Sequence, residues 1–264
     1  MESENYCVSI QLKGGLGNMM FQIATAYSTS IRDSKCFYCD VNMHIIPHKH
    51  YSYYVDNIFK KVDFKDKENI NFYYNEPNFS YDEIPQSQGN AEISGYFQSE
   101  KYFVETRNEI LELFEPDEKT KIKIDSFFED FKEKQTCSIH VRRGDYINAQ
   151  HYHFLQELEY YKNSIDIIGD NNHFLIFSDD ISWCIENFSF LKEKTFVTDF
   201  LDYEQLYLMS LCNHNIITNS TYSWWGAWLN KNDNKKVISP KNWFGPGNQH
   251  LETKDVYCKN WQII

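Results

Sequence analysis

The stretch SIHVRRGDY at positions 138–146 carries the strongest fold signal in this chain. An apolar run ends in two arginines, a glycine and an aspartate, the pattern of a buried strand that opens into a polar loop. Side chains alternate along a strand, so His140 and Arg142 point to one face and Arg143 to the other. A buried strand end suits an arginine only if an anion or a carboxylate accepts its hydrogen bonds. Asp145 is one such partner, and an Arg143–Asp145 pair that braces the loop would leave Arg142 for a ligand phosphate.

Strand and helix signals alternate along most of the chain. Strands are predicted at 6–12, 36–41, 92–97, 136–141, 173–177, 195–197, 215–218 and 236–238. Helices are predicted at 19–31, 100–114, 118–134, 155–168, 180–187, 203–213 and 220–229, whereas 43–88 reads as irregular and aromatic. This alternation indicates parallel sheets covered by helices. We therefore expect an α/β fold with two Rossmann-like domains facing a cleft, 1–134 and 135–264, with the charged helix at 118–134 marking the boundary.

Composition and charge exclude several classes of protein. The 264 residues carry a formal net charge of −12, which disfavours a nucleic acid partner because phosphate binding needs a broad basic surface. The acidic start and the lack of a long apolar run predict no signal peptide and no transmembrane segment, hence a soluble cytoplasmic protein. Seven scattered cysteines argue against a secreted disulfide framework.

No metal site is expected. Cys36 and Cys39 form a Cys-x-x-Cys pattern without a second pair, and we interpret them as strand residues rather than a redox or metal motif. His48 and His50 lie in a polar stretch without nearby carboxylates and read as loop residues. No two aspartates are separated by a single residue, so an Asp-x-Asp metal motif is absent from the sequence.

Two further loops follow predicted strands, where open parallel sheets bind ligands. GGLGN at 14–18 brings backbone N–H groups to a helix start, although tight packing alone also explains it. It matches neither a dinucleotide fingerprint nor a Walker loop. NIITNSTYSWW at 215–225 runs from a strand through a hydroxyl-rich turn into a helix, which suits phosphate binding. Its tryptophan pair is expected in the core rather than under a sugar.

With these residues in view, the chain resembles the α-1,2-fucosyltransferase family nearly from end to end. The resemblance rests on GGLGNMMFQIATAY near the start, GYFQSEKYF at 95–103, HVRRGDY at 140–146, FSDD at 177–180 and HNIITNSTYSWWGAWL at 214–229. It implies a GT-B glycosyltransferase whose second domain binds GDP-fucose, with a glycan acceptor on the side of the first domain. The aromatic region 43–88 is then expected to select the acceptor.

The resemblance also implies roles for individual residues. Arg142 would hold the diphosphate of GDP, His140 would lie against the nucleotide, and Asn18 would reach across the cleft from the first domain. Either Asp202 or Glu204 would read the guanine edge. The catalytic residues would be Arg142, Asn18 and Asp145, and the remaining donor contacts would be Gly15, Gly17, Asn219, Ser220, Thr221, Tyr222 and Ser223.

The expected reaction is a single displacement that inverts C1 of fucose, without a metal or other cofactor. A fixed guanidinium and helix N-termini would stabilise the charge on the leaving diphosphate. Asp145, His153 and acids of the first domain remain alternatives for the base, and weak base assistance is a further one. Two rival functions stay open: a non-catalytic sugar or nucleotide binder, and a protein O-fucosyltransferase.

Overall fold

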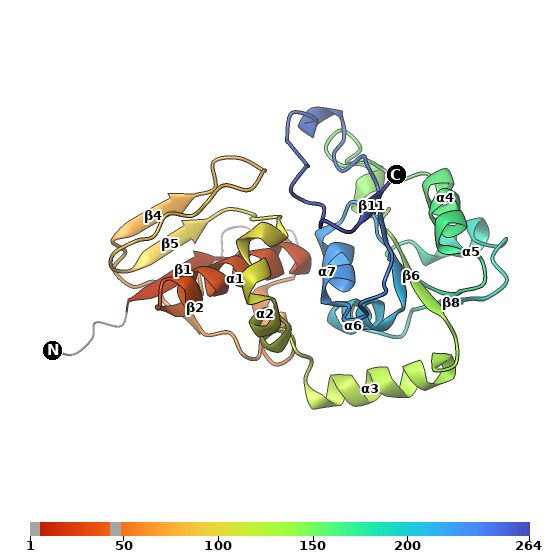
Figure 1. Cartoon of the computed structure of the whole chain (residues 1–264), viewed down its shortest axis with the longest axis horizontal. Helices are drawn as coiled ribbons and strands as arrows, with labels where there is room; N and C mark the ends of the chain where they lie inside the picture. Colours follow the sequence, from red (N-terminus) through yellow and green to blue (C-terminus); the bar gives the residue numbers. More distant parts are fainter. Residues whose placement is uncertain (1–5, 43–48) are drawn as a thin grey trace. The chain divides into compact units, whose positions relative to one another are not determined.

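The computed structural model describes residues 6–42 and 49–264 and divides into two compact units (Figure 1). The first unit extends to Asp117 and includes Glu252–Cys258, and the second comprises Glu118–Leu251 and Lys259–Ile264. Each unit is an α/β layer structure built on its own parallel sheet. The predicted α/β class with two Rossmann-like units is therefore confirmed.

The division between the units falls before α3 (Glu118–Phe128) rather than after the predicted helix at 118–134. Two contacts tie α3 to the second unit. Lys123 forms an ion pair of 2.6 Å with Glu204, and the ring of Phe127 packs edge-on against Phe200. The charged pattern of this helix does not indicate these partners, because Glu204 lies 81 residues beyond Lys123 in the sequence.

The first unit has a five-stranded sheet in the order β3-β2-β1-β5-β4. Its strands are β1 (Cys7–Gln11), β2 (Cys36–Asp40), β3 (Phe64–Lys65), β4 (Phe72–Asn75) and β5 (Ala91–Ser94). The long helix α1 (Leu16–Arg32) follows β1 and is buried over most of its length. The predicted helix at 100–114 is instead two 3₁₀ turns, Glu100–Tyr102 and Val104–Thr106, followed by α2 (Arg107–Leu113).

The glycine loop after β1 is shorter than the sequence suggested. The predicted turn at 13–18 is partly helical, because α1 begins at Leu16 and takes Gly17 and Asn18 into its first turn. Gly14 has a φ of +83°, and a Cβ at that position would lie 2.5 Å from Nδ2 of Asn18. A residue with a side chain would therefore be strained there and would displace Asn18.

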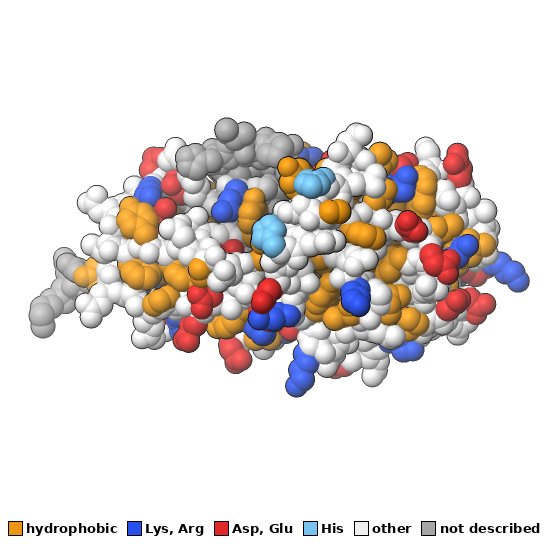
Figure 2. All heavy atoms as spheres, turned by 90° about the horizontal axis from the view of Figure 1, so that it is seen from above, with side chains coloured by type: hydrophobic (Ala, Val, Ile, Leu, Met, Phe, Trp, Pro, Cys, Tyr) orange, Lys and Arg blue, Asp and Glu red, His pale blue; other side chains and the backbone are white. Residues whose placement is uncertain are grey.

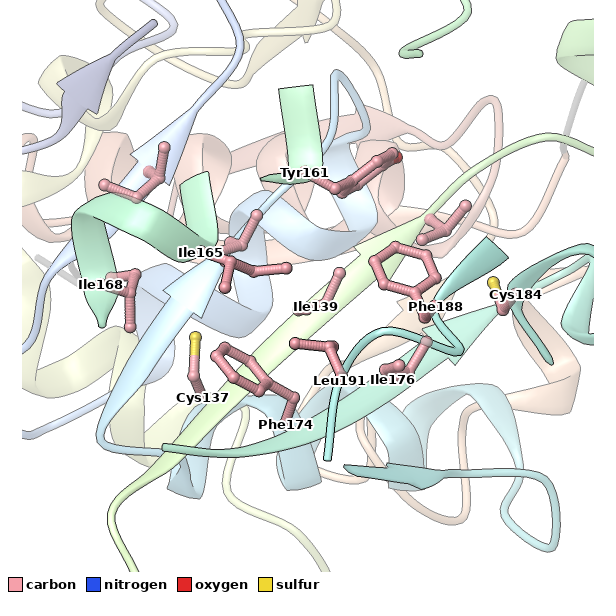
Figure 3. Packing of buried hydrophobic residues seen from close by; sticks show 13 residues of the cluster. Cys137, Ile139, Tyr161, Ile165, Ile168, Phe174, Ile176, Cys184, Phe188 and Leu191 are labelled. Atoms are coloured by element: carbon pink, nitrogen blue, oxygen red, sulfur yellow. The ribbon is translucent and has the colours of Figure 1, made fainter. Parts of the chain in front are cut away.

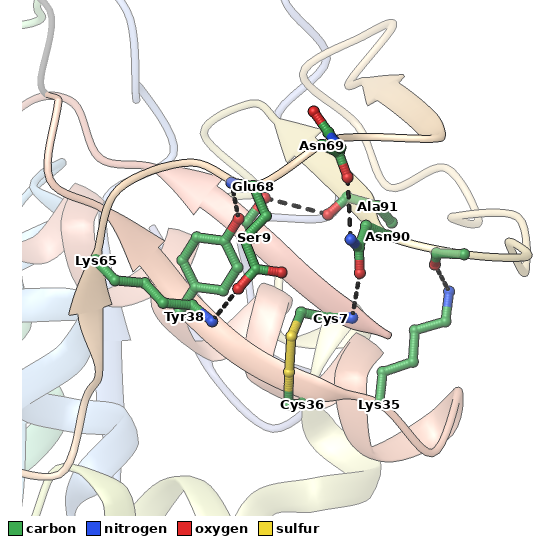
Figure 4. Close-up of a disulfide and its surroundings, with 11 residues drawn as sticks. Cys7, Ser9, Lys35, Cys36, Tyr38, Lys65, Glu68, Asn69, Asn90 and Ala91 are labelled. Atoms are coloured by element: carbon green, nitrogen blue, oxygen red, sulfur yellow. Dashed lines mark hydrogen bonds and ion pairs between the residues drawn. A yellow bond between two sulfur atoms is a disulfide. The ribbon is translucent and has the colours of Figure 1, made fainter. Parts of the chain in front are cut away.

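Two neighbouring strands of the first unit are joined by a disulfide (Figure 4). Cys7 on β1 is the register partner of Cys36 on β2, and their sulfur atoms are bonded. Cys36 and Cys39 both lie in β2, as the sequence predicted, but the pairing of Cys36 with Cys7 was not foreseen. The other five cysteines are free and buried, so within the described residues Cys7–Cys36 is not part of a wider disulfide framework.

The second unit has a six-stranded parallel sheet in the order β11-β10-β9-β6-β7-β8. The strands are β6 (Thr136–Val141), β7 (His173–Ser178), β8 (Lys194–Phe196), β9 (His214–Ile216), β10 (Val237–Ser239) and β11 (Gln262–Ile263). The helices are α4 (Leu158–Ile168), α5 (Ile181–Asn187), α6 (Asp202–Leu211) and α7 (Thr221–Leu229). The chain runs outward from β6 to β8, returns to β9 beside β6, and then runs outward the other way, which is the Rossmann strand order.

Three short strands escaped prediction. β3 and β4 lie within the region interpreted as irregular, and β11 lies near the chain end. Two to four residues are too few to show a period, so these strands depend on pairing with a neighbour. β4, for example, is aligned along β5 from Phe72 to Asn75.

The two faces of β6 have different neighbours. Cys137, Ile139 and Val141 belong to a buried cluster with α4 and α5 (Figure 3). On the opposite face, Ser138 accepts a hydrogen bond from Asn215, whose amide also bonds to the backbone of α6. The alternation predicted for this strand is thus present from its first residue to its last.

The tryptophan pair of α7 belongs to the core. Trp224 and Trp225 are both fully buried and pack against each other and against Trp228. This confirms their predicted place in the core. Within residues 6–42 and 49–264, no helix combines the length and the apolar character needed to cross a membrane.

Candidate active site

The candidate site lies at the carboxyl edge of the second sheet. The ends of β7, β6 and β9 are adjacent there, and the strand order reverses between β6 and β9. Open α/β sheets bind ligands at this kind of reversal point, on the loops that follow the two strands. The loop after β6 begins with Arg142, and the loop after β9 leads into α7. Two of the three segments singled out in the sequence therefore meet at the reversal point.

Arg142 has two carboxylate partners. Its NH2 nitrogen lies 2.7 Å from Oδ1 of Asp145, and its NH1 nitrogen lies 3.1 Å from Oδ2 of Asp179. The expected Arg143–Asp145 pair is therefore wrong, and Arg142 is not left without a protein partner. Asp145 lies three residues after Arg142, at the start of the 3₁₀ turn Asp145–Ile147. The Arg142 side chain remains 30% exposed, so a ligand can reach it.

Arg143 points to the opposite face and pairs with protein, as the alternation predicted. Its Nε lies 3.1 Å from Oδ2 of Asp180, and its guanidinium lies over the ring of Trp183 at 4.2 Å. Its backbone N–H donates to Asp179 at 2.9 Å. The partner, however, is Asp180 at the start of α5 rather than Asp145.

Asp179 and Asp180 are the site residues that sequence reasoning missed. They belong to the FSDD motif at 177–180, which by itself indicates no role for them. The sequence shows only that they come just after the strand predicted at 173–177; the structure adds that β7 is aligned with β6, so that Ser178 pairs with Val141. Carboxylates that follow the neighbouring parallel strand must lie beside the arginines that follow β6.

His140 is a buried, neutral imidazole next to Arg142. It is 5% exposed, and its ring centre lies 5.3 Å from that of Tyr222 in α7. Burial, with a smaller contribution from the Arg142 charge, lowers the pKa of His140 to about 3. Its Nδ1 atom has no hydrogen-bond partner among the described residues. A buried polar atom without a partner is costly, so a ligand that bonds to Nδ1 would gain from it.

The turn into α7 provides fewer free groups than predicted. Ser220 is the N-cap of α7, but its side chain does not cap the helix, and Thr221 is half-buried beside it. The Tyr222 hydroxyl donates to the carbonyl of Asp202, and the Ser223 hydroxyl bonds within the turn to Thr218 and Ser220. Ser220 and Thr221 are the residues of this turn whose hydroxyls remain outside these bonds, and both are half-buried. Their contact with a phosphate stays a prediction.

Asn219 differs from its neighbours in the same turn. Its side chain is buried, and both its amide nitrogen and its amide oxygen bond to protein groups. A contact between this side chain and a donor, which the sequence led us to expect, would have to break these bonds.

The two acidic residues considered for the guanine edge have different surroundings. Glu204 is 5% exposed, accepts the Leu201 N–H at 2.7 Å and is paired with Lys123. Its carboxylate therefore fixes the start of α6. Asp202 lies next to Tyr222, which contacts His140. Of the two, Asp202 is the one connected to the site.

The two named candidates for the base lie close to Arg142. The carboxylate of Asp145 is 51% exposed and bonded to Arg142. The ring of His153 is stacked on Tyr146, with ring centres 4.5 Å apart and 7° between the planes. Burial lowers the pKa of His153, although the Asp145 charge opposes this shift. His153 is therefore a neutral imidazole at neutral pH and able to accept a proton.

The predicted residues of the first unit lie at the carboxyl edge of its own sheet. Gly15 is the N-cap of α1, and Asn18 in the first turn accepts a hydrogen bond of 3.1 Å from the amide of Gln98. Gln98 follows β5, which is the parallel neighbour of β1 in this sheet. Gly15 and Asn18, which follow β1, therefore lie beside a residue that follows the adjacent strand. Their contact with a donor stays a prediction.

Metal-binding residue types do not gather in the described part of the chain. No three histidine, cysteine, aspartate or glutamate side chains in 6–42 and 49–264 are grouped so as to hold a metal ion. Charged side chains of both signs are scattered over the face drawn in Figure 2, without a broad basic area among the described residues there.

Comparison with known proteins gives the family. The sequence pattern of Glycosyl transferase family 11 matches residues 7–264. The chain belongs to this family. The resemblance to fucosyltransferases that the motifs suggested is thereby confirmed at the level of the family, and the protein is a family 11 glycosyltransferase.

Individual relatives of this family 11 protein act on different sugars. An alpha-1,2-colitosyltransferase of Escherichia coli is 31% identical, over 97% of this chain and 98% of its own length. A galactoside 2-alpha-L-fucosyltransferase of Bos taurus is 25% identical over 84% of this chain and 64% of its own length. The fucosyltransferase NodZ from Bradyrhizobium shares the fold, with a TM-score of 0.57 at 13% identity over 84% of this chain and 93% of its own. The fold is therefore of the GT-B type.

Proposed function

We propose that this family 11 enzyme transfers L-fucose from GDP-fucose to the 2-hydroxyl of a terminal galactoside, forming an α-1,2 linkage. The observation that carries the proposal is Arg142, which lies at the reversal point of the second sheet on the same face as the buried His140. The N-terminus of α7 follows the adjacent strand. The galactoside 2-alpha-L-fucosyltransferase relative supports the choice of sugar and linkage.

The guanidinium of Arg142 would bind the diphosphate and stabilise the charge that develops when GDP leaves. Its two carboxylate partners must then be partly replaced by phosphate oxygens. Asp179 is held by the backbone of Arg143, whereas Asp145 is half exposed and has the greater freedom to move. We therefore expect Asp145 to give up its place on Arg142. Preorganised charge of this kind is worth roughly 3–4 kcal/mol per donor group in comparable sites.

A base would take the proton of the acceptor hydroxyl in the same step that breaks the bond to GDP. Attack from the face opposite the leaving group turns a β-linked donor into an α-linked product. Asp145, once released from Arg142, and His153, neutral at neutral pH, are the candidates beside the proposed diphosphate position. Acids of the first unit remain alternatives, because the acceptor is expected on that side.

Catalysis without a metal is part of this proposal. The fixed charge of Arg142 and the N–H groups of α7 would do what a divalent cation does in enzymes with an Asp-x-Asp motif. Turnover should therefore survive an excess of EDTA. Loss of turnover on chelation, with recovery on adding Mn²⁺ or Mg²⁺, would contradict this part of the proposal.

A colitose donor is the second candidate, because the colitosyltransferase relative matches this chain almost from end to end. The test offers GDP-fucose and the corresponding colitose nucleotide to the purified protein, each with a panel of galactose-terminated oligosaccharides. Linkage analysis of the product is expected to show fucose on the 2-hydroxyl. Transfer of colitose alone would overturn the proposed donor, and transfer only to folded protein domains would overturn the proposed acceptor.

A further inference from the structure

The side chain of Asn219 makes four hydrogen bonds inside the second unit. Its Nδ2 donates to the carbonyl oxygens of Phe154 at 2.9 Å and Trp243 at 2.8 Å. Its Oδ1 accepts from the Thr218 hydroxyl at 2.9 Å and from the Gln156 amide at 3.1 Å. Carbonyl oxygens only accept, so the nitrogen must face them and the orientation of the amide is fixed. Both N–H groups and both lone pairs are used.

A fifth hydrogen bond links Asn219 to the arginine loop. The hydroxyl of Tyr146 donates to the backbone carbonyl of Asn219 at 2.9 Å. Tyr146 lies in the short 3₁₀ turn Asp145–Ile147, in the same loop as Arg142, and its ring lies 5.6 Å from the Arg142 guanidinium carbon. The five bonds therefore join the loop after β6, the segment before α4, the turn before α7 and the segment after β10.

Two of these segments also pack closely on each other. Gly245 and Gly247 donate backbone hydrogen bonds to Tyr152 and His151, at 3.0 and 2.7 Å. A Cβ on Gly245 would lie 2.2 Å from the carbonyl oxygen of Gln150, so the approach requires a glycine. Asn219 thus bonds to loops that already support one another, and the group has little freedom to adjust.

We propose that Asn219 is a positioning residue that fixes the Arg142–Tyr146 loop relative to the N-terminus of α7. These are the two elements to which the proposed function assigns the diphosphate, so the inference rests on that function. Asn219 itself does not touch the donor. Moving a charged group by about 1 Å in a catalytic site can cost about a hundredfold in rate, so a shift of the loop should appear in turnover.

The test compares Asn219→Asp with Asn230→Asp. Asn230 is a matched buried amide beyond the far end of α7: its Nδ2 donates to Cys212 at 2.7 Å and Asn215 at 2.8 Å, and its Oδ1 accepts from Asn232 at 2.9 Å. Both variants should melt at a lower temperature, because each loses buried hydrogen bonds. At a temperature where both are folded, kcat of Asn219→Asp should fall by about tenfold or more, whereas that of Asn230→Asp stays within about threefold.

The pH profile separates positioning from general loosening. In Asn219→Asp, the new carboxylate faces two carbonyl oxygens in a buried site, so its protonated form is favoured and can donate one hydrogen bond. The ratio of its kcat to the wild-type kcat should therefore rise as the pH falls from about 8 to about 6. A wild-type kcat in folded Asn219→Asp would overturn the proposal. An equal loss of kcat in both variants, with no recovery of Asn219→Asp at low pH, would overturn it as well.

Failure of the proposed function is distinguished by a readout that needs no substrate. Hydrogen–deuterium exchange of the amides in 142–156 should be faster in Asn219→Asp and unchanged in Asn230→Asp. If the wild type neither transfers fucose nor binds GDP while this exchange pattern is seen, the link between Asn219 and the loop stands and the assigned donor is wrong. Unchanged exchange in both variants contradicts the positioning role itself.

Discussion

Two arginines follow β6 and point to opposite faces of the sheet, yet their surroundings differ. On the face of α6 and α7, Arg142 lies beside the buried imidazole of His140, whose Nδ1 has no hydrogen-bond partner in the described part of the chain. Two partly exposed carboxylates hold Arg142 there. On the face of α4 and α5, Arg143 is only 17% exposed and lies between Asp180 and the ring of Trp183. One guanidinium can exchange its partners for a ligand, whereas the other completes the packing around α5.

The largest effect should come from Arg142→Lys. Lysine keeps the charge but loses the planar fork that bonds to two phosphate oxygens, so kcat/KM should fall well beyond tenfold, by about 2–4 kcal/mol. The melting temperature without ligand should be unchanged, because the pairs of Arg142 are partly exposed. Kinetics and thermal melts measure the two parts. Near-normal turnover of Arg142→Lys would contradict the claim that Arg142, and not Arg143, binds the diphosphate.

His140 should make the stability of the second unit depend on pH. Its folded pKa of about 3 lies below the ordinary histidine pKa of 6.5, so in acid the unfolded chain binds a proton that the folded protein excludes. The stability is complete above the unfolded pKa and is lost as the pH falls from there toward the folded pKa. His140→Gln does not titrate and should lose less stability over this window. Parallel curves of melting temperature against pH for the two proteins would refute the assignment of a neutral His140.

Arg143→Lys should act mainly on stability. Lysine cannot both bond to Asp180 and stack its planar group on Trp183, so we expect a loss of about 1 kcal/mol in the free energy of unfolding. Denaturant melts measure it. In the remaining folded protein, kcat/KM should stay within about threefold of wild type. A stable but inactive Arg143→Lys would reverse the assignment of the two faces.

Substitutions in the first unit are expected to have the smallest effect on donor binding. Of the tyrosines and histidines at 44–54 expected to select the acceptor, those before Lys49 lie outside the described residues. Tyr53 is 41% exposed, and its ring lies 4.2 Å from the Lys49 ammonium. Tyr53→Ala should raise the acceptor KM or change its preference, with the GDP Kd within about threefold. A large loss of GDP affinity would place the donor in the other unit.

Much of the secondary structure of the second unit could be predicted, because the sequence patterns that indicate strands and helices are local. β6 has the predicted bounds, and α5 and α7 begin directly after Asp180 and Ser220, polar residues of the kind that precede helices. The direction of each arginine followed from strand alternation alone. Their partners did not, because Asp179 and Asp180 reach them through the pairing of β7 with β6, and the sequence does not state which strands are neighbours.

The same limit explains the other corrections. Asn219 reads as a phosphate contact within its motif, and only the folded chain brings Phe154, Gln156 and Trp243 to its amide. Glu204 reads as a free acid at a helix start until Lys123, from a helix 81 residues away in sequence, is seen beside it. From the sequence alone, a side chain that stabilises the fold cannot be distinguished from one that binds a ligand, because its neighbours in space are not known.

The most direct test measures how much GDP raises the melting temperature of the wild type, Arg142→Lys and Arg143→Lys. We expect GDP to stabilise the wild type and Arg143→Lys by similar amounts and Arg142→Lys far less, with the lower melting temperature without ligand belonging to Arg143→Lys. Equal stabilisation of all three by GDP, or its loss in Arg143→Lys alone, would contradict the claim that the diphosphate is bound from the face that β6 shares with α6 and α7.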